Sequence, residues 1–512
     1  MSAAGGSARK ASVGARALWV AWLLVPMAVA LVVGRWGITR VSVDRDETAT
    51  IDIGTRTVPQ IFRMIQNADA VHATYYVIMH YWMGWFGTSP TAIRSLSLIG
   101  VVIAAGALTG LGWHLVSKRA GITAGLLYAC APMISAIAHD ARSYGLVSAV
   151  AVLTTFALVR AIESTRRRTW IWFGVGVVVL ILLHLLTALI LVAYAVTVGW
   201  YALRERDWRV VRRFAGTVAL AAVPLLPLGY LALKQAGTAG WITRPTWAVA
   251  GDAAVDFAGS VFLIGPVVIL IALAYRRRPK AAGSEVARAR IPSVLNVGLP
   301  WLLIPPVGLL VISIWDPLYV FRYVLYSLPA LALLVAAGLD RLRWWLHVPI
   351  VVALIALTIP MHHEVRSTLI GANDTRREAH FIAANKRSGD AIVYLVPTQR
   401  FMSKSYPAAY AGLRDIGLLE SQAAAANFSG LNVSDAVLMQ RLEETDRVWA
   451  VKYWAFPSAR PANRLLEEKR YAQFKAAGLH WVETKHFRGG AILLFSRHAL
   501  AAEAKFHPGV VS

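Results

Sequence analysis

Four carboxylates crowd into ten residues of the stretch VDRDETATID, which begins at Val43. They are Asp44, Asp46, Glu47 and Asp52, with Arg45 between the first two. Like charges that are packed together raise one another's pKa, so acids are usually spaced apart unless they bind a cation or prepare a base. The alternative interpretation is a solvated loop that flanks a helix. The stretch is therefore a candidate for proton transfer or for cation binding.

Further residues with polar chemistry lie beside apolar runs. In HDARSYGL, Asp140 and Arg142 place opposite charges at the end of such a run, where they need either water or each other. The alternative for this pair is a helix cap with an ion pair. In FRYVLYSLP, Arg322 precedes Tyr323, and the planar fork of an arginine suits a phosphate. An arginine at this position can also simply reach lipid head groups.

Metal and thiol chemistry find less support in the sequence. Asp46, Asp140 and the isolated His72 could gather a divalent metal, but their spacing forms no pattern of metal ligands. His72 by itself is more often structural than catalytic. Cys130 is the single cysteine of the chain, so no intrachain disulfide can form. A divalent metal stays open as an alternative.

The elements that must position these residues are mostly apolar helices. The chain has 512 residues, of which 57% are hydrophobic and 16% charged, and its mean hydropathy is +0.54. Apolar runs that are nearly free of charge cover residues 17–33, 98–115, 150–159, 170–198, 218–233, 253–274, 297–314, 319–337 and 346–360. Several reach the roughly 20 residues that a helix needs to cross a bilayer. We predict a polytopic α-helical membrane protein.

The net charge of +24 is placed in the short links between these runs. Basic clusters occur at residues 9–10, 118–119, 166–168, 204–213, 276–278 and 341–343. Lysine and arginine gather in this way on cytoplasmic loops. A basic face for nucleic acid is the weaker alternative, so no nucleic-acid partner is predicted.

Threading the chain with its basic loops in the cytoplasm gives about eleven spans and a cytoplasmic N-terminus. Residues 170–203 are long enough for a hairpin of two short spans that turns near His184. The first external loop then covers residues 38–91 and contains the acids near Asp46. Within this loop, residues 57–66 and 74–86 are expected to form helices that lie in the membrane interface. The polar residues near positions 72, 140, 234, 244 and 322 also fall on the external face.

The character of the chain changes near residue 362. Residues 390–396, 447–454 and 491–496 have the pattern of buried strands, and residues 375–385 and 463–478 that of helices. We therefore predict a membrane domain over residues 1–361 and a small extracytoplasmic α/β domain over residues 362–512.

Several of these motifs, taken in order, resemble the GT-C superfamily of membrane glycosyltransferases, specifically the bacterial glycosyltransferase family 39, or aminoarabinose transferase-like, group. The acidic pair Asp46-Glu47 follows the first span, as in that family. The segment DAVHATYYVIMHYWMGWFGTSPTAIRSLS is similar to the family's next motif, DARSYGL to its Glu-Ala-Arg-x-Tyr-x-Leu, and RYVLYSLPAL to its late Arg-Tyr. Two departures are Ala73-Thr74 in place of Pro-Pro, and Asp69, which lies one residue further from His72.

The resemblance implies an inverting glycosyltransferase that moves a sugar from a polyprenyl-phosphate donor to an acceptor hydroxyl on the external face of the membrane. It implies Asp46 as the base, with Glu47 as the alternative. The expected donor-binding residues are Arg322, Tyr323, Lys234 and Arg244. Further site candidates are Asp69, His72, Asp140, Arg142 and Tyr144. The sugar could be mannose or arabinofuranose, and the acceptor an envelope glycan, a glycolipid or a protein.

Two other classes of protein stay open. A transporter or flippase for lipid-linked sugars would also combine many spans with polar residues at their ends, although it more often shows internal repeats and charges at mid-membrane. A non-catalytic membrane protein could bind cell-wall glycan through its external domain. Loss of turnover in Asp46→Asn with the fold retained would separate an enzyme from both.

Overall fold

The computed structural model describes residues 22–498 except 165, 276–291, 368–372 and 454–460. The chain forms two compact units. We call the one that contains residues 70–75, 91–367 and the described part of the first 38 residues the helical unit. The other contains residues 39–69, 76–90 and the described part of 368–512, and we call it the sheet unit.

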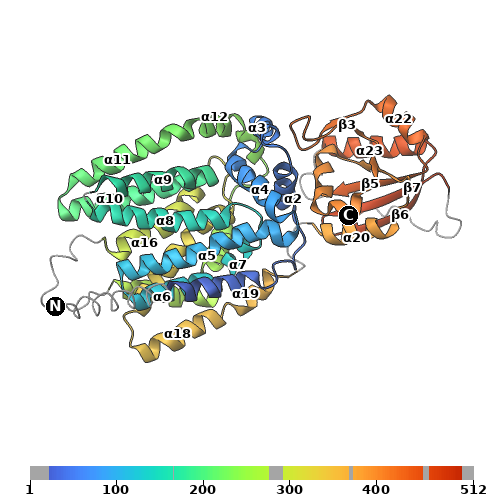
Figure 1. Ribbon diagram of the computed structural model, residues 1–512. Helices are drawn as coiled ribbons and strands as arrows, with labels where there is room; N and C mark the ends of the chain where they lie inside the picture. Colours follow the sequence, from blue (N-terminus) through green and yellow to red (C-terminus); the bar gives the residue numbers. More distant parts are fainter. Residues whose placement is uncertain (1–21, 165, 276–291, 368–372, 454–460, 499–512) are drawn as a thin grey trace, which may run out of the picture. The chain divides into compact units, whose positions relative to one another are not determined.

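The helical unit is built from apolar helices that run side by side, as α5, α8, α9 and α10 do in Figure 1. Its helices are α5 Pro90–Leu115, α6 Lys118–Ala129, α7 Pro132–Ala138, α8 Tyr144–Glu163, α9 Arg167–Leu183, α10 Ile190–Glu205, α11 Trp208–Ala222, α12 Leu226–Lys234, α13 Trp247–Ala258, α14 Ile264–Ala274, α16 Val294–Ile312, α17 Leu328–Leu339, α18 Trp344–Ala356 and α19 Ile359–Glu364. Short 3₁₀ segments interrupt them, among them η1 Ala70–His72, η2 Leu185–Leu189 and η6 Phe321–Ser327.

Within the described residues, seven helices are long and apolar enough to cross a membrane, or up to nine if each of two bent pairs is one span. This confirms the predicted polytopic helical architecture. The predicted number of spans was about eleven. The count by length leaves out Trp22–Arg35, the described part of the predicted first span, and α9, which has 17 residues. The predicted turn near His184 is confirmed, because α9 ends at Leu183 and η2 begins at Leu185.

Glycines allow α5 and α8 to approach backbone to backbone. A Cβ atom built on Gly145, near the start of α8, would lie 2.2 Å from the backbone oxygen of Ser97 in α5. One built on Gly100 would lie 2.4 Å from the carbonyl carbon of Gly145. Small residues let helices pack this closely inside a membrane. The packing fixes the position of the segment that enters α8, which carries Arg142 and Tyr144.

The sheet unit contains a five-stranded sheet with strand order β2-β1-β5-β7-β6. Its strands are β1 Ala391–Tyr394, β2 Arg414–Asp415, β5 Arg447–Tyr453, β6 His480–Phe487 and β7 Gly490–Ser496. β1 pairs in parallel with β2 and β5, whereas β7 pairs antiparallel with β5 and β6. The predicted strands correspond to β1, β5 and β7. The prediction missed β2, which has only two residues, and β6, whose register shifts between Trp481 and Glu483.

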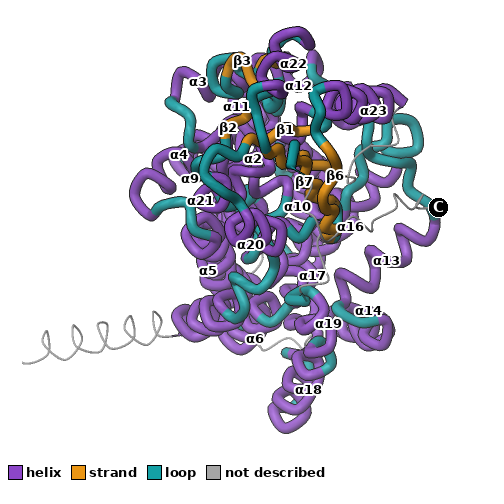
Figure 2. The backbone as a smooth tube through the Cα atoms, turned by 90° about the vertical axis from the view of Figure 1, so that its right-hand side faces the viewer, coloured by secondary structure: helices purple, strands orange, loops and turns teal. Residues whose placement is uncertain are grey.

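Helices cover both faces of this sheet (Figure 2). Leu438 of α22 Asp435–Glu443 and Phe474 of α23 Pro461–Ala476 pack on one face. Ile382 of α20 Thr375–Asn385 and Ala49 of α2 Arg45–Gly54 belong to the cluster on the other face. The predicted small C-terminal α/β fold is therefore confirmed, and its two predicted helices correspond to α20 and α23.

Segments from the predicted first external loop also belong to the sheet unit. Hydrogen bonds run from Thr375 Oγ1 to the carbonyl oxygen of Val43 (2.6 Å) and from Ser42 Oγ to Asp374 Oδ1 (3.0 Å). The two predicted helices of this loop coincide with α3 Val58–Asn67 and α4 Ala73–Phe86. Their location in a membrane interface, and the division of the chain at residue 362, stay predictions.

A buried carboxyl group lies in the sheet unit between two tyrosines. Glu378 of α20 is 3% exposed, and its Oε1 accepts hydrogen bonds from Tyr410 Oη (2.5 Å) and from Tyr453 Oη. Burial raises the pKa of Glu378 to about 7, and the two tyrosine hydroxyls oppose this rise. Because the folded pKa lies above the unfolded value of 4.5, stability from this group is fully present below pH 4.5 and is lost as the pH rises to about 7.

Glu378→Gln should remove this loss, because glutamine mimics the protonated carboxyl group and cannot ionise. At pH 8 the variant should be more stable than the wild type by up to roughly 3 kcal/mol, and at pH 5 by only about 1 kcal/mol. Chemical unfolding of the purified chain in detergent, followed by tryptophan fluorescence from pH 5 to pH 8, measures the difference. Parallel pH profiles for the two proteins would contradict the shifted pKa.

Candidate functional site

Five buried or half-buried polar side chains of the helical unit surround one histidine, His184. We call this group the His184 cluster; it consists of His72, Arg142, Tyr144, His184, Arg322 and Tyr323. The residues come from η1, from the segment entering α8, from the junction of α9 with η2, and from η6. The structure thus brings together five of the residues that the sequence predicted from three separate motifs.

The cationic part of the cluster is formed by two arginines. Arg142 Nη2 lies 2.5 Å from His72 Nε2, and both side chains are buried. Burial lowers the pKa of His72 well below its ordinary value, and the charges of Arg142, His184 and Arg322 lower it further. His72 is therefore neutral and accepts the hydrogen bond from the Arg142 guanidinium. The positive charge of the site belongs to Arg142 and Arg322.

The aromatic part of the cluster is formed by His184 and two tyrosines. The ring centroids of His184 and Tyr323 are 5.0 Å apart, and those of His184 and Tyr144 are 5.7 Å apart. Within the described part of the chain, the buried atoms Tyr144 Oη and His184 Nδ1 have no hydrogen-bond partner. Buried polar atoms are nearly always hydrogen-bonded, so these two indicate a place for water or a ligand.

Local breaks in the helices create this arrangement. α9 stops where His184 adopts an extended backbone (φ −161°, ψ 110°), and Thr187 Oγ1 then donates to the carbonyl oxygens of Leu180 (3.1 Å) and His184 (2.7 Å). Nearby, Tyr326 Oη donates to the carbonyl oxygen of Leu186 at 3.3 Å, which connects η6 to η2. These hydrogen bonds satisfy carbonyl oxygens that the ends of the helices leave free.

The remaining predicted residues of the helical unit lie in different surroundings. Asp140 is half-buried in the turn between α7 and α8, and its charge acts on Tyr144. Lys234 is exposed at the end of α12, and Arg244 is exposed in the loop before α13. The structure provides no contact of Lys234 or Arg244 with the His184 cluster among the described residues. Gln235 lies nearer to it, since its Oε1 accepts from the backbone N–H of Ala70 in η1 at 2.9 Å.

His184 is the member of the cluster that was not predicted as a site residue. It stands in the apolar stretch ILLHLLTAL, where a polar residue is costly unless it has a function or a partner. This signal was available in the sequence. What the sequence did not show is that His184 would meet side chains from residues 72, 144 and 323.

In the sheet unit, three of the four clustered acids have structural roles. Asp44 caps α2: its Oδ1 accepts from the N–H of Glu47 at 2.8 Å, and Glu47 Oε2 accepts from the N–H of Asp44 at 3.2 Å. This reciprocal pair is a capping box with an aspartate in the first position. Asp52 forms a buried ion pair with Arg56 at 2.7 Å. The density of acids is thus explained in part by the helix itself.

Asp46 differs from these three acids in its surroundings. It lies half-buried in the first turn of α2, beside Arg45. Burial lowers the pKa of Arg45, and the negative charge of Asp46 raises it. The Arg45 guanidinium lies 5.9 Å from the ring of Phe401. The acid that the resemblance singles out is therefore paired electrostatically with an arginine that is held against an aromatic ring.

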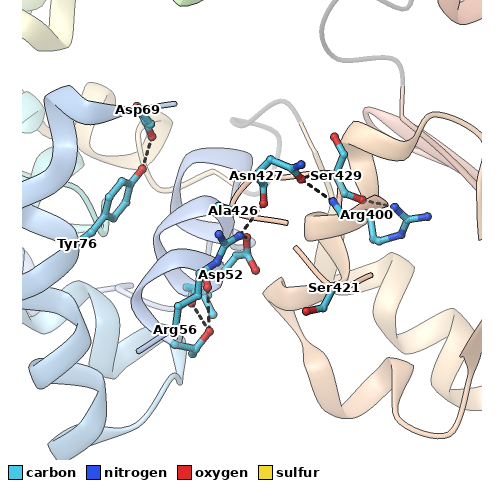
Figure 3. A network of polar contacts seen from close by, with 12 residues as sticks. Asp52, Arg56, Asp69, Tyr76, Arg400, Ser421, Ala426, Asn427 and Ser429 are labelled. Atoms are coloured by element: carbon cyan, nitrogen blue, oxygen red, sulfur yellow. Dashed lines mark hydrogen bonds and ion pairs between the residues drawn. The ribbon is translucent and has the colours of Figure 1, made fainter. Parts of the chain in front are cut away.

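Figure 3 shows how the segment after these acids is held within the sheet unit. Arg56 Nη2 donates to Asp52 Oδ2 and also to the carbonyl oxygen of Asn427 at 2.9 Å. Asn67 Nδ2 donates to the carbonyl oxygen of Ala426 at 3.1 Å. The turn at residues 426–427 thus fixes both ends of the segment that contains α3.

The predicted candidate Asp69 accepts a short hydrogen bond from Tyr76 Oη (Figure 3). Its backbone has a φ of 60°, a left-handed conformation that aspartate tolerates better than most residues. The bond to Tyr76 gives Asp69 a structural role at the entry to α4. Within the described residues, no group of three or more histidine, cysteine, aspartate or glutamate side chains is placed to hold a metal ion.

Comparison with known proteins shows similarity in structure rather than in sequence. No protein-family model and no curated protein matches the sequence. The solved structure of ArnT from Cupriavidus metallidurans in the apo state is similar, with a TM-score of 0.59, 15% identity, and coverage of 93% of this chain and 98% of that chain. The same protein bound to undecaprenyl phosphate gives a TM-score of 0.61 at 14% identity and the same coverage.

A weaker match is the arabinofuranosyltransferase AftD from mycobacteria, with a TM-score of 0.45, 14% identity, and coverage of 93% of this chain and 41% of that chain. At such low identities the likeness shows the fold. This chain has the fold of ArnT over nearly the whole length of both proteins. The predicted fold class, a polytopic helical membrane protein with a small C-terminal α/β region, is therefore confirmed.

Proposed function

We propose that this chain is a membrane glycosyltransferase that transfers a sugar from a polyprenyl phosphate to an acceptor hydroxyl, with inversion at the anomeric carbon. The observation that carries the proposal is the His184 cluster, in which two arginines converge with a buried hydroxyl and a buried imidazole nitrogen that have no partner among the described residues. The whole-chain likeness to ArnT, which has been solved bound to undecaprenyl phosphate, supports it.

The His184 cluster suits the phosphate of the donor. Arginine presents a planar fork of N–H donors that matches phosphate oxygens. We assign Arg142 and Arg322 to these oxygens, with Tyr144 Oη as a further donor and Tyr323 as the aromatic wall. Cationic donors in a buried site stabilise the negative charge that develops on a departing phosphate. Lys234 and Arg244 are exposed and receive no role in this proposal.

We assign the base to Asp46. In the proposed step, the acceptor oxygen forms a bond to the anomeric carbon while the bond between this carbon and the phosphate oxygen breaks. The electron pair leaves with the polyprenyl phosphate, and the acceptor proton passes to the Asp46 carboxylate. Attack opposite the leaving group inverts the anomeric configuration. Glu47 is the weaker choice, because its carboxylate already closes the capping box of α2.

The sugar and the acceptor stay open in this proposal. Mannose and arabinofuranose are both candidates for the sugar, and an envelope glycan, a glycolipid or a protein for the acceptor. The experiment that tests the function is incubation of the purified chain with a panel of polyprenyl-phosphate sugars and membrane extract, followed by mass spectrometry of the products. Sugar transfer that depends on Asp46 would support the proposal, whereas consumption of no donor in the panel would count against it.

A transporter for lipid-linked sugars is the second candidate, because the two arginines of the His184 cluster would suit its lipid phosphate equally well. A reconstituted transporter would move the intact donor across a bilayer without cleaving it. A glycosyltransferase releases polyprenyl phosphate, which mass spectrometry detects directly. The non-catalytic alternative, a glycan-binding membrane protein, would do neither.

We further propose that the N-terminus is cytoplasmic and that the C-terminal residues lie outside the cytoplasm. The basic links between the apolar runs support this orientation. A reporter enzyme that is active only in the cytoplasm should be silent when fused after Ser512 and active when fused before Met1. The opposite pattern would reverse the orientation and place the proposed base on the cytoplasmic side.

A further inference from the structure

The sheet unit carries an open cleft with a volume of about 620 Å³, which the sugar-transfer proposal does not use. We call it the basic cleft, because six of its eight lining residues are basic. The six are Arg376, Arg377, His380, Lys485, His486 and Arg488. The two others are Phe381 and Phe487. None of the lining residues is acidic.

The walls of the basic cleft are joined to each other. The backbone N–H of Asp374, which caps α20, donates to the carbonyl oxygen of Arg488 at 2.9 Å. Asn373 Nδ2 donates to the carbonyl oxygen of the neighbouring Gly489 at 3.2 Å. The rings of Phe381 on α20 and Phe487 on β6 lie 5.8 Å apart. The start of α20 and the β6–β7 turn are therefore held together as the two walls of one cleft. β6 is an edge strand of the sheet (Figure 2).

The cations of the basic cleft differ in their contacts from several cations elsewhere on this unit. Outside the cleft, three cations lie directly against carboxylates, in Arg400–Asp415 (2.5 Å), Lys452–Glu467 (2.6 Å) and Lys469–Asp435 (2.5 Å), whereas others, such as Arg441, bind backbone carbonyl oxygens. Inside it, Arg377 reaches Asp374 only at 3.9 Å. Arg376 donates to Tyr406 Oη and to backbone carbonyl oxygens, which leave its charge uncompensated. The side chain of Lys485, which is exposed on β6, makes no hydrogen bond or ion pair within the described part of the chain.

The position of two of these cations on α20 adds to the unfavourable electrostatics. Arg376 and Arg377 lie in the first turn of the helix, which begins at Thr375. The N-terminal end of a helix carries a partial positive charge, so cations are disfavoured there and anions are favoured. An anion in the cleft would relieve both the repulsion among the cations and the repulsion by the helix.

We propose that the basic cleft binds a phosphoryl group. Arginine pairs match phosphate oxygens bidentately, and a phosphoryl group carries enough charge to offset several cations at once. The group could belong to the head group of a membrane lipid or to a soluble phosphorylated molecule. This inference does not depend on the proposed sugar transfer, because none of the residues in the cleft belongs to the His184 cluster or to α2.

The test compares two double variants of the full chain, purified in a neutral detergent. Arg377→Gln with Lys485→Gln removes two exposed cations of the cleft. Arg464→Gln with Lys475→Gln removes two exposed cations of α23 and is the matched control. Isothermal titration calorimetry measures binding of sodium pyrophosphate, with sodium acetate at equal ionic strength as a second control. The cleft variant should bind pyrophosphate about tenfold more weakly than the wild type and the α23 variant.

A second titration distinguishes the two sources of the phosphoryl group. It uses the short-chain lipid dihexanoylphosphatidylglycerol, with dihexanoylglycerol as the phosphate-free analogue. Tighter binding of the phospholipid than of pyrophosphate assigns a lipid head group, and the reverse order assigns a soluble ligand. The proposal is overturned if the cleft variant binds both probes as well as the α23 variant does. Equal binding of acetate and pyrophosphate by the wild type would also overturn it, since the cleft would then be an unselective basic surface.

Discussion

Asp46→Asn is expected to lower the turnover of donor by about 10²–10⁴-fold, the effect of losing a general base. Asparagine keeps the shape and most of the hydrogen bonding of aspartate but cannot accept the proton of the acceptor hydroxyl. Binding of the donor should change far less, because the loss is felt in the transition state. Steady-state release of polyprenyl phosphate gives the turnover, and donor titration gives the affinity.

The three neighbouring acids provide matched controls. The structure gives each of them a structural role, so the effect of replacing each carboxylate by an amide can be predicted. Asp44→Asn keeps an N-cap residue of nearly equal strength, and Glu47→Gln keeps the capping box, which accepts either residue. Both variants should fold and turn over normally. Asp52→Asn removes the carboxylate from a buried ion pair with Arg56 and should lower stability more than turnover per folded molecule.

A normal rate in Asp46→Asn together with an inactive Glu47→Gln would move the base by one residue. Normal rates in all four variants would remove the main support for an enzyme from this segment. Unfolding measurements on each variant separate a loss of chemistry from a loss of structure.

Arg322→Lys should lower kcat/KM for the donor by roughly 10–10²-fold. Lysine keeps the charge but replaces a planar fork of donors with a single ammonium group, and a charged hydrogen bond contributes about 1.5–3 kcal/mol. Tyr323 should lose its contact with the guanidinium at the same time, since this group lies 5.9 Å from the ring. Turnover assays with varied donor concentration measure the change.

Arg213→Lys is the matched control for this substitution, because Arg213 is exposed on α11 and distant in sequence from every member of the His184 cluster. It should leave kcat/KM unchanged. Arg142→Lys should resemble Arg322→Lys, since both guanidinium groups are assigned to the same phosphate. If Arg322→Lys supports normal turnover, Arg322 is a lipid-facing cation rather than a donor-binding residue.

The sequence by itself determined the class of the protein and most of its elements. Runs of apolar residues such as 297–314 identify spans because the thickness of a bilayer sets the length of a helix that crosses it. The strand β5 and the helix α23 were predicted because the periodicity of buried side chains is a local property. The turn near His184 was also predicted, because residues 170–203 are long enough for two short spans.

The sequence motifs identified most residues of the candidate site, but they did not show that these residues meet around His184. Residues 72, 142, 144, 322 and 323 meet around His184 because η1, the entry to α8, the end of α9 and η6 are packed together. Packing of elements that are distant in sequence has no signature in the spacing of single residues. For the same reason, the sequence could not tell that Lys234 and Arg244 would be exposed.

Tertiary structure also decided what each acid near the first span does. In the sequence, Asp44, Asp46, Glu47 and Asp52 are equivalent carboxylates in one short stretch. In the structure, backbone N–H groups at the start of α2 bind two of them, and a buried arginine, which is also held by the carbonyl oxygen of Asn427, binds a third. Those partners depend on where the helix begins and on contacts that span more than 370 positions of the chain. Charge and spacing are written in the sequence, but hydrogen-bond partners and burial exist only once the chain has folded.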